Sequence, residues 1–267
     1  MKISVVTISF NQARYLRACI ASVAQQGGDW EHIIVDPGST DGSREIIEAN
    51  RHCFAQFVLE PDRGPADGLN KGFERATGDV VYYLNADDII LPDTFDEARA
   101  FLTERPWIDV VSGHGYVIDE SGQSKRPLWS DQVSRLGLAH GGSILIQPAT
   151  FIRKSAFDRT KGFNPENRSN WDSELVLDLF LSGSRFAICE RHWAGYRIHD
   201  QSITGTAKLD DRIRDWSRRK YELLMGRPIG WDTSALTQFF RLKRALRRPE
   251  AIIARLAGER VYGGRKK

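Results

Sequence analysis

Short apolar runs alternate with amphipathic segments over the first hundred residues of the chain. The run Ile3–Ile8 is continuous, as is typical of a strand buried on both faces, and residues 14–25 place apolar side chains at helical spacing. The same reasoning predicts strands over residues 32–35, 57–59 and 80–84, and helices over residues 43–50 and 66–76. Strands that alternate with helices form βαβ units, so we predict an α/β fold with a mostly parallel central sheet flanked by helices.

After residue 110 the pattern is less regular. A hairpin-like pair of short strands is predicted over residues 110–112 and 115–118, and residues 125–138 are expected to be irregular. Further segments are expected to be extended at 143–146 and 150–152, helical at 173–181, and extended again at 186–188 and 193–197. From about residue 206 the tail is predicted to be helical, because apolar residues again recur at helical spacing.

Length and composition allow one large domain with an extension. The chain has 267 residues, of which 41% are apolar and 27% are charged, as in an ordinary globular protein. The formal net charge of +3 hides two unlike parts. Residues 1–204 hold 21 basic and 28 acidic residues, whereas residues 205–267 hold 17 and 7. We therefore predict a domain over residues 1–204 and a basic helical extension over residues 205–267, with Gly205 at the boundary.

The sequence favours neither a disulfide framework, a zinc site nor a membrane-spanning segment. Three widely spaced cysteines, Cys19, Cys53 and Cys189, show no pairing typical of metal ligands. No stretch approaches 18 consecutive apolar residues, and the first apolar run is too short for a signal peptide. The expected compartment is the cytoplasm.

Three predicted strands end in polar clusters, at residues 9–11, 36–41 and 85–88. Ligands of open α/β sheets bind beyond the carboxyl ends of the strands, so we expect these clusters to converge on one edge of the sheet. No G-x-G-x-x-G follows the first strand, which disfavours a dinucleotide-dependent dehydrogenase.

Asp87 and Asp88 are adjacent carboxylates that directly follow an apolar strand. A divalent cation such as Mn²⁺ or Mg²⁺ would relieve their repulsion, since both ions prefer carboxylate oxygens. The alternative is a solvated loop in which Asp88 or Asp93 caps the helix that starts near Pro92. Residues 85–88, which we call the acidic loop, do not by themselves decide between a metal site and a solvated loop.

Three other side chains are candidates for chemistry. Asp36 lies in a loop rich in turn residues, where it would accept hydrogen bonds from a nucleoside or belong to an ordinary connection. Asp172 precedes an apolar helix and is either a helix cap or a general base. His199 follows a late predicted strand. It is either a hydrogen-bonded structural residue or a ligand, since a neutral imidazole can bind Mn²⁺.

Taken together, these residues resemble glycosyltransferase family 2, the inverting enzymes of the GT-A fold. The resemblance covers about residues 1–204 and is strongest to bacterial members that build surface polysaccharides. It implies a Rossmann-like domain with a nucleotide-binding half over residues 1–110 and an acceptor-side half over residues 111–204. The matching segments occur in the family's order: SVVTISFNQARYL at 4–16, HIIVDPGSTDGS at 32–43, EPDRGPADGLNKGFERATGDVVYYLNADD at 60–88 and WDSELVLDL at 171–179.

The resemblance also implies roles on the donor side. Asp36 would contact the nucleotide base or ribose, and Ser9 would line the nucleotide pocket, which the helix carrying Asp67 and Lys71 borders. Asp87 matches the last aspartate of the family's metal-binding DxD motif and would hold Mn²⁺ or Mg²⁺ on the donor diphosphate.

On the acceptor side, Asp172 matches the catalytic base, and His199 matches a histidine that completes metal coordination in some relatives. The implied reaction is an inverting transfer of a sugar from a nucleotide sugar, by default a UDP-sugar, to a hydroxyl of a saccharide or lipid-linked acceptor. The implied setting is bacterial cell-surface polysaccharide biosynthesis.

Two positions depart from the family pattern. Pro37 stands where many members have a second aspartate that reads uracil, which leaves the donor base open. Asn85 replaces the first acid of the DxD motif, and this predicts a weaker metal site. The alternative function is therefore a catalytically weak relative that binds sugar nucleotides or acts as a scaffold.

The basic tail contains one amphipathic segment. Over residues 233–248 a helical wheel separates apolar from basic side chains: Phe239, Leu242 and Leu246 against Arg241, Arg244 and Arg248. Such a helix either lies on an anionic membrane, at the inner face of the plasma membrane, or packs on the domain with a solvated basic face. A second short helix is expected after Pro249. Nucleic acid is disfavoured as a partner, since no nucleic-acid motif is present and the domain is acidic.

Overall fold

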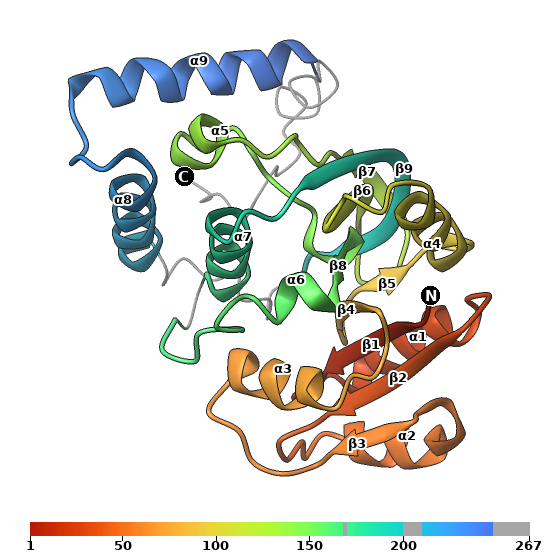
Figure 1. Cartoon of the computed structure of the whole chain (residues 1–267). Helices are drawn as coiled ribbons and strands as arrows, with labels where there is room; N and C mark the ends of the chain where they lie inside the picture. Colours follow the sequence, from red (N-terminus) through yellow and green to blue (C-terminus); the bar gives the residue numbers. More distant parts are fainter. Residues whose placement is uncertain (168–169, 200–209, 248–267) are drawn as a thin grey trace.

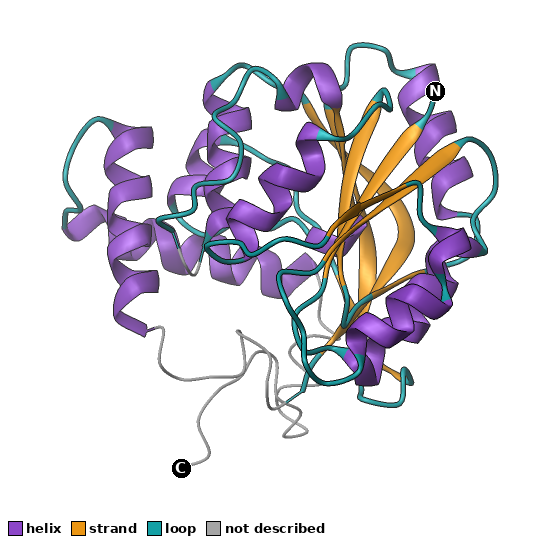
Figure 2. Cartoon of the chain, turned by 90° about the horizontal axis from the view of Figure 1, so that it is seen from below, coloured by secondary structure: helices purple, strands orange, loops and turns teal. Residues whose placement is uncertain are grey.

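The computed structural model describes residues 1–167, 170–199 and 210–247. Within them, one twisted sheet forms the centre of the molecule and helices cover both of its faces (Figures 1 and 2). The strand order is β3-β2-β1-β4-β8-β6-β9-β5, and β7 pairs with β6. The predicted α/β fold with a mostly parallel central sheet is thereby confirmed.

The first half of the sheet is parallel. It consists of β1 (Ile3–Ile8), β2 (Trp30–Val35), β3 (Gln56–Val58) and β4 (Val80–Asn85). The intervening helices are α1 (Ala13–Ala24), α2 (Ser43–Ala49) and α3 (Pro65–Glu74), with a 3₁₀ turn at Arg51–Cys53. Alternate strand residues face opposite layers: Ile34 packs with α1 and α2, whereas Ile33 packs with α3.

The second half of the sheet is mixed. Its strands are β5 (Ile89–Ile90), β6 (Val110–Ile118), β7 (Ser124–Leu128), β8 (Thr150–Arg153) and β9 (Phe186–Arg197). Strand β6 runs parallel to β9 and antiparallel to β7 and β8. The helices are α4 (Thr94–Glu104), α5 (Arg135–Ala139), α6 (Lys154–Phe157) and α7 (Trp171–Leu181), with a 3₁₀ turn at Gln147–Ala149.

Three predictions for this half were wrong. The pairs of short strands predicted at 110–118 and at 186–197 are each one continuous strand. The segment expected to be irregular, residues 125–138, contains most of β7 and of α5. Gly113 interrupts the apolar pattern of β6 because the Trp193 ring of β9 occupies the space of a side chain, with atoms 2.5 Å from an ideal Cβ. A cross-strand neighbour, not a turn, explains the glycine.

The described part of the extension is helical, as predicted. It forms α8 (Asp210–Met225) and α9 (Trp231–Arg247), which lie beside α5 and α7 at one end of the molecule (Figure 1). Trp216 and Leu224 of α8 pack with Leu138 of α5 and Leu177 of α7. The boundary proposed at Gly205 and the short helix expected after Pro249 lie outside the described residues. None of the described helices combines the length and apolar character needed to cross a membrane.

Candidate active site

The carboxyl ends of three strands meet at one edge of the sheet, as the sequence predicted. Ile8 at the end of β1 lies level with Val35 of β2 and with Asn85 of β4. The loops that follow therefore start side by side. On the other flank, Gly195 of β9 pairs with Ile89, which brings the segment after β9 to the same edge.

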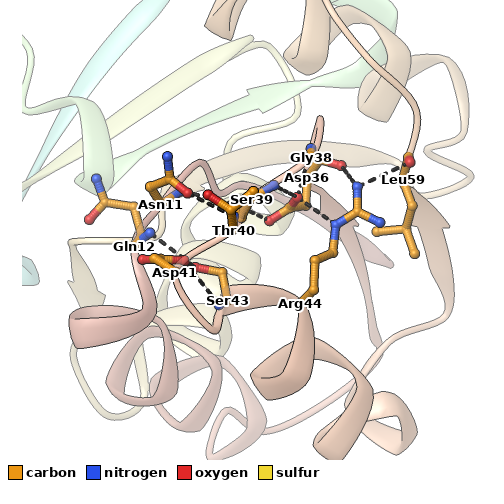
Figure 3. A network of polar contacts seen from close by, with 10 residues as sticks. All are labelled: Asn11, Gln12, Asp36, Gly38, Ser39, Thr40, Asp41, Ser43, Arg44 and Leu59. Atoms are coloured by element: carbon orange, nitrogen blue, oxygen red, sulfur yellow. Dashed lines mark hydrogen bonds and ion pairs between the residues drawn. The ribbon is translucent and has the colours of Figure 1, made fainter.

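Asp36 is the centre of a hydrogen-bond network in the loop after β2 (Figure 3). Its side chain is fully buried. Oδ1 accepts from the backbone amides of Gly38 and Ser39 and from Arg44 Nε at 2.6 Å, while Oδ2 accepts from Ser39 Oγ at 2.7 Å. Burial alone would raise the pKa of Asp36, but these donors outweigh burial and lower it, so the carboxylate stays ionised.

The same network ties the β1 loop to the β2 loop. The backbone amide of Asn11 donates to Ser39 Oγ, and the side-chain Oδ1 of Asn11 accepts from the backbone amide of Thr40 (Figure 3). Asn11 takes the left-handed conformation, with φ of 54°, which asparagine tolerates better than most residues. The two loops therefore form one rigid unit at the edge of the sheet.

Arg44 was missed by the sequence reasoning. It lies in the first turn of α2, and its Nη2 also donates to the backbone carbonyl oxygens of Asp36 and Leu59. A cation in the first turn opposes the helix dipole, so its presence there was the available signal. Arg44 thus links the loop after β2 to the loop after β3.

Ser9 and Phe10 follow β1 directly. Ser9 is buried, and its Oγ has no hydrogen-bond partner among the described residues. Phe10 is 60% exposed, which is unusual for a large aromatic ring beside a polar edge of the sheet. Sequence reasoning included Ser9 and overlooked Phe10.

Asp67 and Lys71 lie on α3, one turn apart. Asp67 accepts from the backbone amide of Arg63 and pairs with its guanidinium at 3.1 Å, while Lys71 Nζ donates to the Pro61 carbonyl at 2.7 Å. Both side chains hold the segment before α3 in place. Neither needs a ligand to complete its contacts in this arrangement.

Asp87 and His199 are brought together, although they come from distant parts of the chain. His199 Nε2 lies 3.0 Å from Oδ2 of Asp87. The imidazole is buried and packs against the ring of Tyr15 from α1, with ring centroids 4.8 Å apart. The two side chains predicted as metal ligands thus meet at the predicted edge.

Asp88 has a different environment from its neighbour. It is buried, and its Oδ1 accepts from the Arg197 backbone amide at 2.8 Å. Burial, and then the charge of Asp87, raise the pKa of Asp88 well above its ordinary value. Asp88 therefore does not cap the following helix. Asp93 stands at the N-cap position of α4, but its side chain makes no capping hydrogen bond.

Arg197 is a second residue whose importance only the structure reveals. Its guanidinium donates to the carbonyl oxygens of Asp87, Asp119 and Glu120, and it lies over the Tyr15 ring. Arg197 is buried and fixes the backbone of the acidic loop from the side of β9. The position of His199, two residues later, depends on this anchor.

Asn85, which stands in place of an acid, uses its amide for a structural contact. Its Nδ2 donates to Oε1 of Gln147 at 3.0 Å, and Gln147 Nε2 donates to the carbonyl of Tyr83. Asn85 therefore fastens the acidic loop to the 3₁₀ turn at Gln147–Ala149.

Asp172 lies at the start of α7, half-buried, with Oδ1 accepting from the Ser173 amide. Burial raises the pKa of Asp172, and the Ser173 amide and the charge of Lys220 oppose that rise. The Asp172 and Asp88 carboxylates both raise the pKa of the buried Tyr83 hydroxyl, after the effect of burial itself. The predicted base and Asp88 are therefore both near enough to Tyr83 of β4 for their charges to act on its hydroxyl.

Asp87 and His199 together fit a divalent cation of the Mn²⁺ type. A carboxylate oxygen and an imidazole nitrogen 3.0 Å apart are two suitable donors for one ion. Among the described residues no group of three such side chains could hold a metal. Further ligands would therefore have to come from the substrate, which is common for ions bound with phosphates.

The sequence matches the model of the family described as "Glycosyl transferase family 2" over residues 4–161, more than half of the chain. The chain belongs to glycosyltransferase family 2.

Relatives in this family are similar over most of the chain. An uncharacterised glycosyltransferase of Mycobacterium tuberculosis is 34% identical, over 81% of this chain and 84% of its own. An uncharacterised glycosyltransferase of the cyanobacterium Nostoc is 28% identical over 74% of this chain. The aligned region spans only 65% of the Nostoc protein.

Solved structures have the same fold. Staphylococcus aureus TarS 1–349 in complex with UDP-GlcNAc superposes with a TM-score of 0.69 at 20% identity, over 92% of this chain and 72% of that one. The mannosyltransferase PcManGT of Pyrobaculum calidifontis, in complex with GDP-Man and Mn²⁺, gives 0.59 at 18% identity, over 94% and 80%. At these identities the likeness establishes the GT-A-like fold of this family 2 member.

Proposed function

We propose that this family 2 protein is an inverting glycosyltransferase that transfers a sugar from a nucleotide sugar, with a UDP-sugar as the first candidate, to an acceptor hydroxyl. The observation that carries the proposal is the Asp87–His199 pair at the sheet edge. The charges of Asp172 and Asp88 both act on Tyr83 of β4, so the proposed base belongs to the same region. Asp87 and His199 would hold a cation on the leaving diphosphate, and Asp172 would accept the proton of the incoming hydroxyl.

The donor nucleotide would occupy the edge formed by the loops after β1 and β2. The exposed Phe10 ring offers a face on which a base can stack, and the unpaired Ser9 Oγ can exchange hydrogen bonds with it. Asp36 has one acceptor lone pair left on Oδ2. Because the Asp36 side chain is fully buried, its proposed role is to shape the loop, and a nucleotide would contact Oδ2 only after Ser39 moves aside.

Asp87 and His199 would hold Mn²⁺ or Mg²⁺ between the protein and the donor diphosphate. A bound cation supplies neutralisation of the charge that develops on the departing nucleoside diphosphate. The imidazole favours Mn²⁺ over Mg²⁺, because Mg²⁺ prefers oxygen ligands. Proton removal from the acceptor is the task of a protein side chain.

Asp172 would act as the general base. It removes the proton from the acceptor hydroxyl as the oxygen attacks the anomeric carbon and the bond to the diphosphate breaks, which inverts that carbon. The raised pKa brings the carboxylate closer to the pH at which a base is both ionised and able to take a proton.

The test is a measurement of nucleotide release from a panel of UDP- and GDP-sugars, with and without Mn²⁺. Wild-type protein is expected to hydrolyse its own donor slowly with water as acceptor. Asp172→Asn should lose roughly 10²–10⁴-fold in turnover and keep donor binding. The matched control is Asp178→Asn, which makes the same change further along α7. Equal rates for both variants would refute the base assignment.

A saccharide or lipid-linked saccharide on a bacterial cell surface pathway is the proposed acceptor, and α9 supports a membrane location. Phe239, Leu242 and Leu246 are between 56% and 72% exposed on this helix, while Phe240 turns inward against the ring of His140. The sequence of α9 has four basic residues and one acid. We propose that this apolar stripe enters an anionic bilayer surface.

A scaffolding or binding-only relative is the second candidate, because Asn85 lowers the charge of the metal site. Such a protein would bind sugar nucleotides without releasing the diphosphate. The nucleotide-release assay separates it from the enzyme directly.

A further inference from the structure

Helix α8 contacts the first turn of α7, next to the proposed catalytic base, although the sequence assigned α8 to a separate extension. Trp216 Nε1 donates to Oγ of Ser173 at 3.1 Å, and Ser173 directly follows Asp172. The contact joins the middle of α8 to the first turn of α7. The basic extension is therefore in contact with the residue next to Asp172.

Three residues of α8 share one face. Trp216, Lys220 and Leu224 are spaced by four positions, which places them one above another on a helix. Trp216 and Leu224, the outer two, are buried against α5 and α7. Lys220, between them, faces the same way and is half-buried.

The charge of Lys220 acts on Asp172. Burial lowers the pKa of the Lys220 ammonium, and Asp172 is the charged group that raises it again. Conversely, Lys220 is the charged group that opposes the effect of burial on the pKa of Asp172. The two charges are coupled from opposite helices, across the contact that the Trp216 indole fixes.

We propose that α8 is part of the catalytic machinery and that Lys220 is a positioning residue, which keeps Asp172 ionised and ready to accept a proton. The proposal rests on the proposed role of Asp172 as the base. A carboxylate in a poorly solvated place would otherwise hold its proton and could not act as a base. Lys220 supplies the compensating charge without being a proton acceptor for the substrate.

Other titratable groups around α7 do not replace this charge. The Tyr83 hydroxyl of β4 stays protonated, because its pKa is well above 10. Glu174 accepts hydrogen bonds from two asparagine amides of the preceding loop. Lys161 acts on a carboxylate further along the helix.

The direct test is a ¹³C NMR titration of protein labelled at the aspartate carboxyl carbons, with the Asp172 signal assigned by its loss in Asp172→Asn. In Lys220→Met the midpoint of Asp172 should rise by roughly one pH unit, and Lys220→Arg should restore it. Arg219→Met is the matched control, because it removes an equal charge from an exposed position of the same helix. Lys220→Gln repeats the comparison with a polar side chain.

The kinetic test follows nucleotide release across pH. The acidic limb should move upward with the Asp172 midpoint, so the rate on that limb falls about tenfold for each pH unit by which the midpoint rises. A midpoint unchanged in both Lys220→Met and Lys220→Gln would overturn the proposal, whatever their activity. Full activity of Asp172→Asn would instead refute the base assignment and leave the measured coupling to stand, so the two failures are distinguishable.

Discussion

His199 Nε2 lies 3.0 Å from Oδ2 of Asp87, although 112 residues separate the two in the chain. The contact depends on β9, whose end is fixed by hydrogen bonds from Arg197 to the acidic loop. The proposed metal site would take two ligands from these side chains and its remaining ligands from the substrate. Its affinity for a cation is therefore expected to depend on the nucleotide.

Binding of Mn²⁺ should be weak without nucleotide and tighter with UDP, because the described protein donors are few. Asn85→Asp adds a carboxylate beside Asp87 and should strengthen Mn²⁺ binding in the absence of nucleotide. Isothermal titration calorimetry with Mn²⁺ alone and with saturating UDP measures both effects. Tight binding of Mn²⁺ to the nucleotide-free wild type would contradict this expectation, and so would a failure of His199→Ala to weaken binding.

Arg44→Met should destabilise the protein by about 1–3 kcal/mol, because it removes a charged donor from the fully buried Asp36 carboxylate. It should also weaken nucleotide binding, since the loops after β1 and β2 share this network. Chemical denaturation and UDP titration are the measurements. Arg51→Met, which breaks an exposed pair with Glu48, should change stability by no more than about 1 kcal/mol. Equal losses in the two variants would show that Arg44 has no special role.

Glu31 should make stability depend on pH in the acid range. Burial alone would raise its pKa, but hydrogen bonds from Ser4, Lys2 and Thr77 lower it to about 2. A folded pKa below the unfolded value gives stabilisation that is present above about pH 4.5 and is lost as the pH falls towards 2.

Glu31→Gln should lack this part of the pH dependence and should lose roughly 1–3 kcal/mol at neutral pH. Urea unfolding between pH 2 and 7 tests both statements. Glu48→Gln is the exposed control and should follow the wild-type curve. Parallel curves for the wild type and Glu31→Gln would contradict the assignment.

Gly113→Ala should cost about 1–3 kcal/mol, because the added Cβ would overlap the buried ring of Trp193 and force β6 and β9 apart. Thermal unfolding measures the loss. Ser124→Ala on the exposed part of β7 should stay within about 0.5 kcal/mol of the wild type. A stable Gly113→Ala protein would mean that β9 can shift away, and His199 would then be expected to move with it.

Leu242→Glu should weaken binding to vesicles containing anionic lipid by roughly tenfold or more, because it places a charge within the exposed apolar stripe of α9. Ser234→Glu adds the same charge to an exposed position on the other side of the helix and should have a smaller effect. Vesicle sedimentation at low and high salt is the measurement. Binding that is equally weak for wild type and both variants would exclude the membrane proposal. Dimerisation lost in Leu242→Glu would identify a second copy as the partner of the stripe.

Much of the first half of the fold could be predicted because its strands and helices bury regular faces. Ile3–Ile8 was found with its predicted ends, and the three polar clusters meet where parallel strands end. The second half was harder to predict, because β6 and β9 contain glycine and polar residues that interrupt the apolar pattern. Their presence is explained by side chains on neighbouring strands. Gly113 beside Trp193 is the clearest case.

The candidate site divides in the same way. Asp36, Asp87, Asp172 and His199 were named as candidates from residue types, their order along the chain and the resemblance to the family. The partners of these residues could not be named from the sequence. Nothing in the local pattern around Arg44 or Lys220 indicates which residue of another element each one acts on.

By itself the sequence indicated the family, the parallel half of the sheet and the candidate residues for the chemistry. Local burial patterns and motif spacing are properties of the chain alone, and this is why they could be read directly. Only the tertiary structure decided that His199 meets Asp87, that Asp36 is held by Arg44, and that Trp216 of α8 contacts Ser173, next to Asp172. Hydrophobic periodicity indicates that one face of a helix or strand is buried. Only the packed chain shows which other element covers that face.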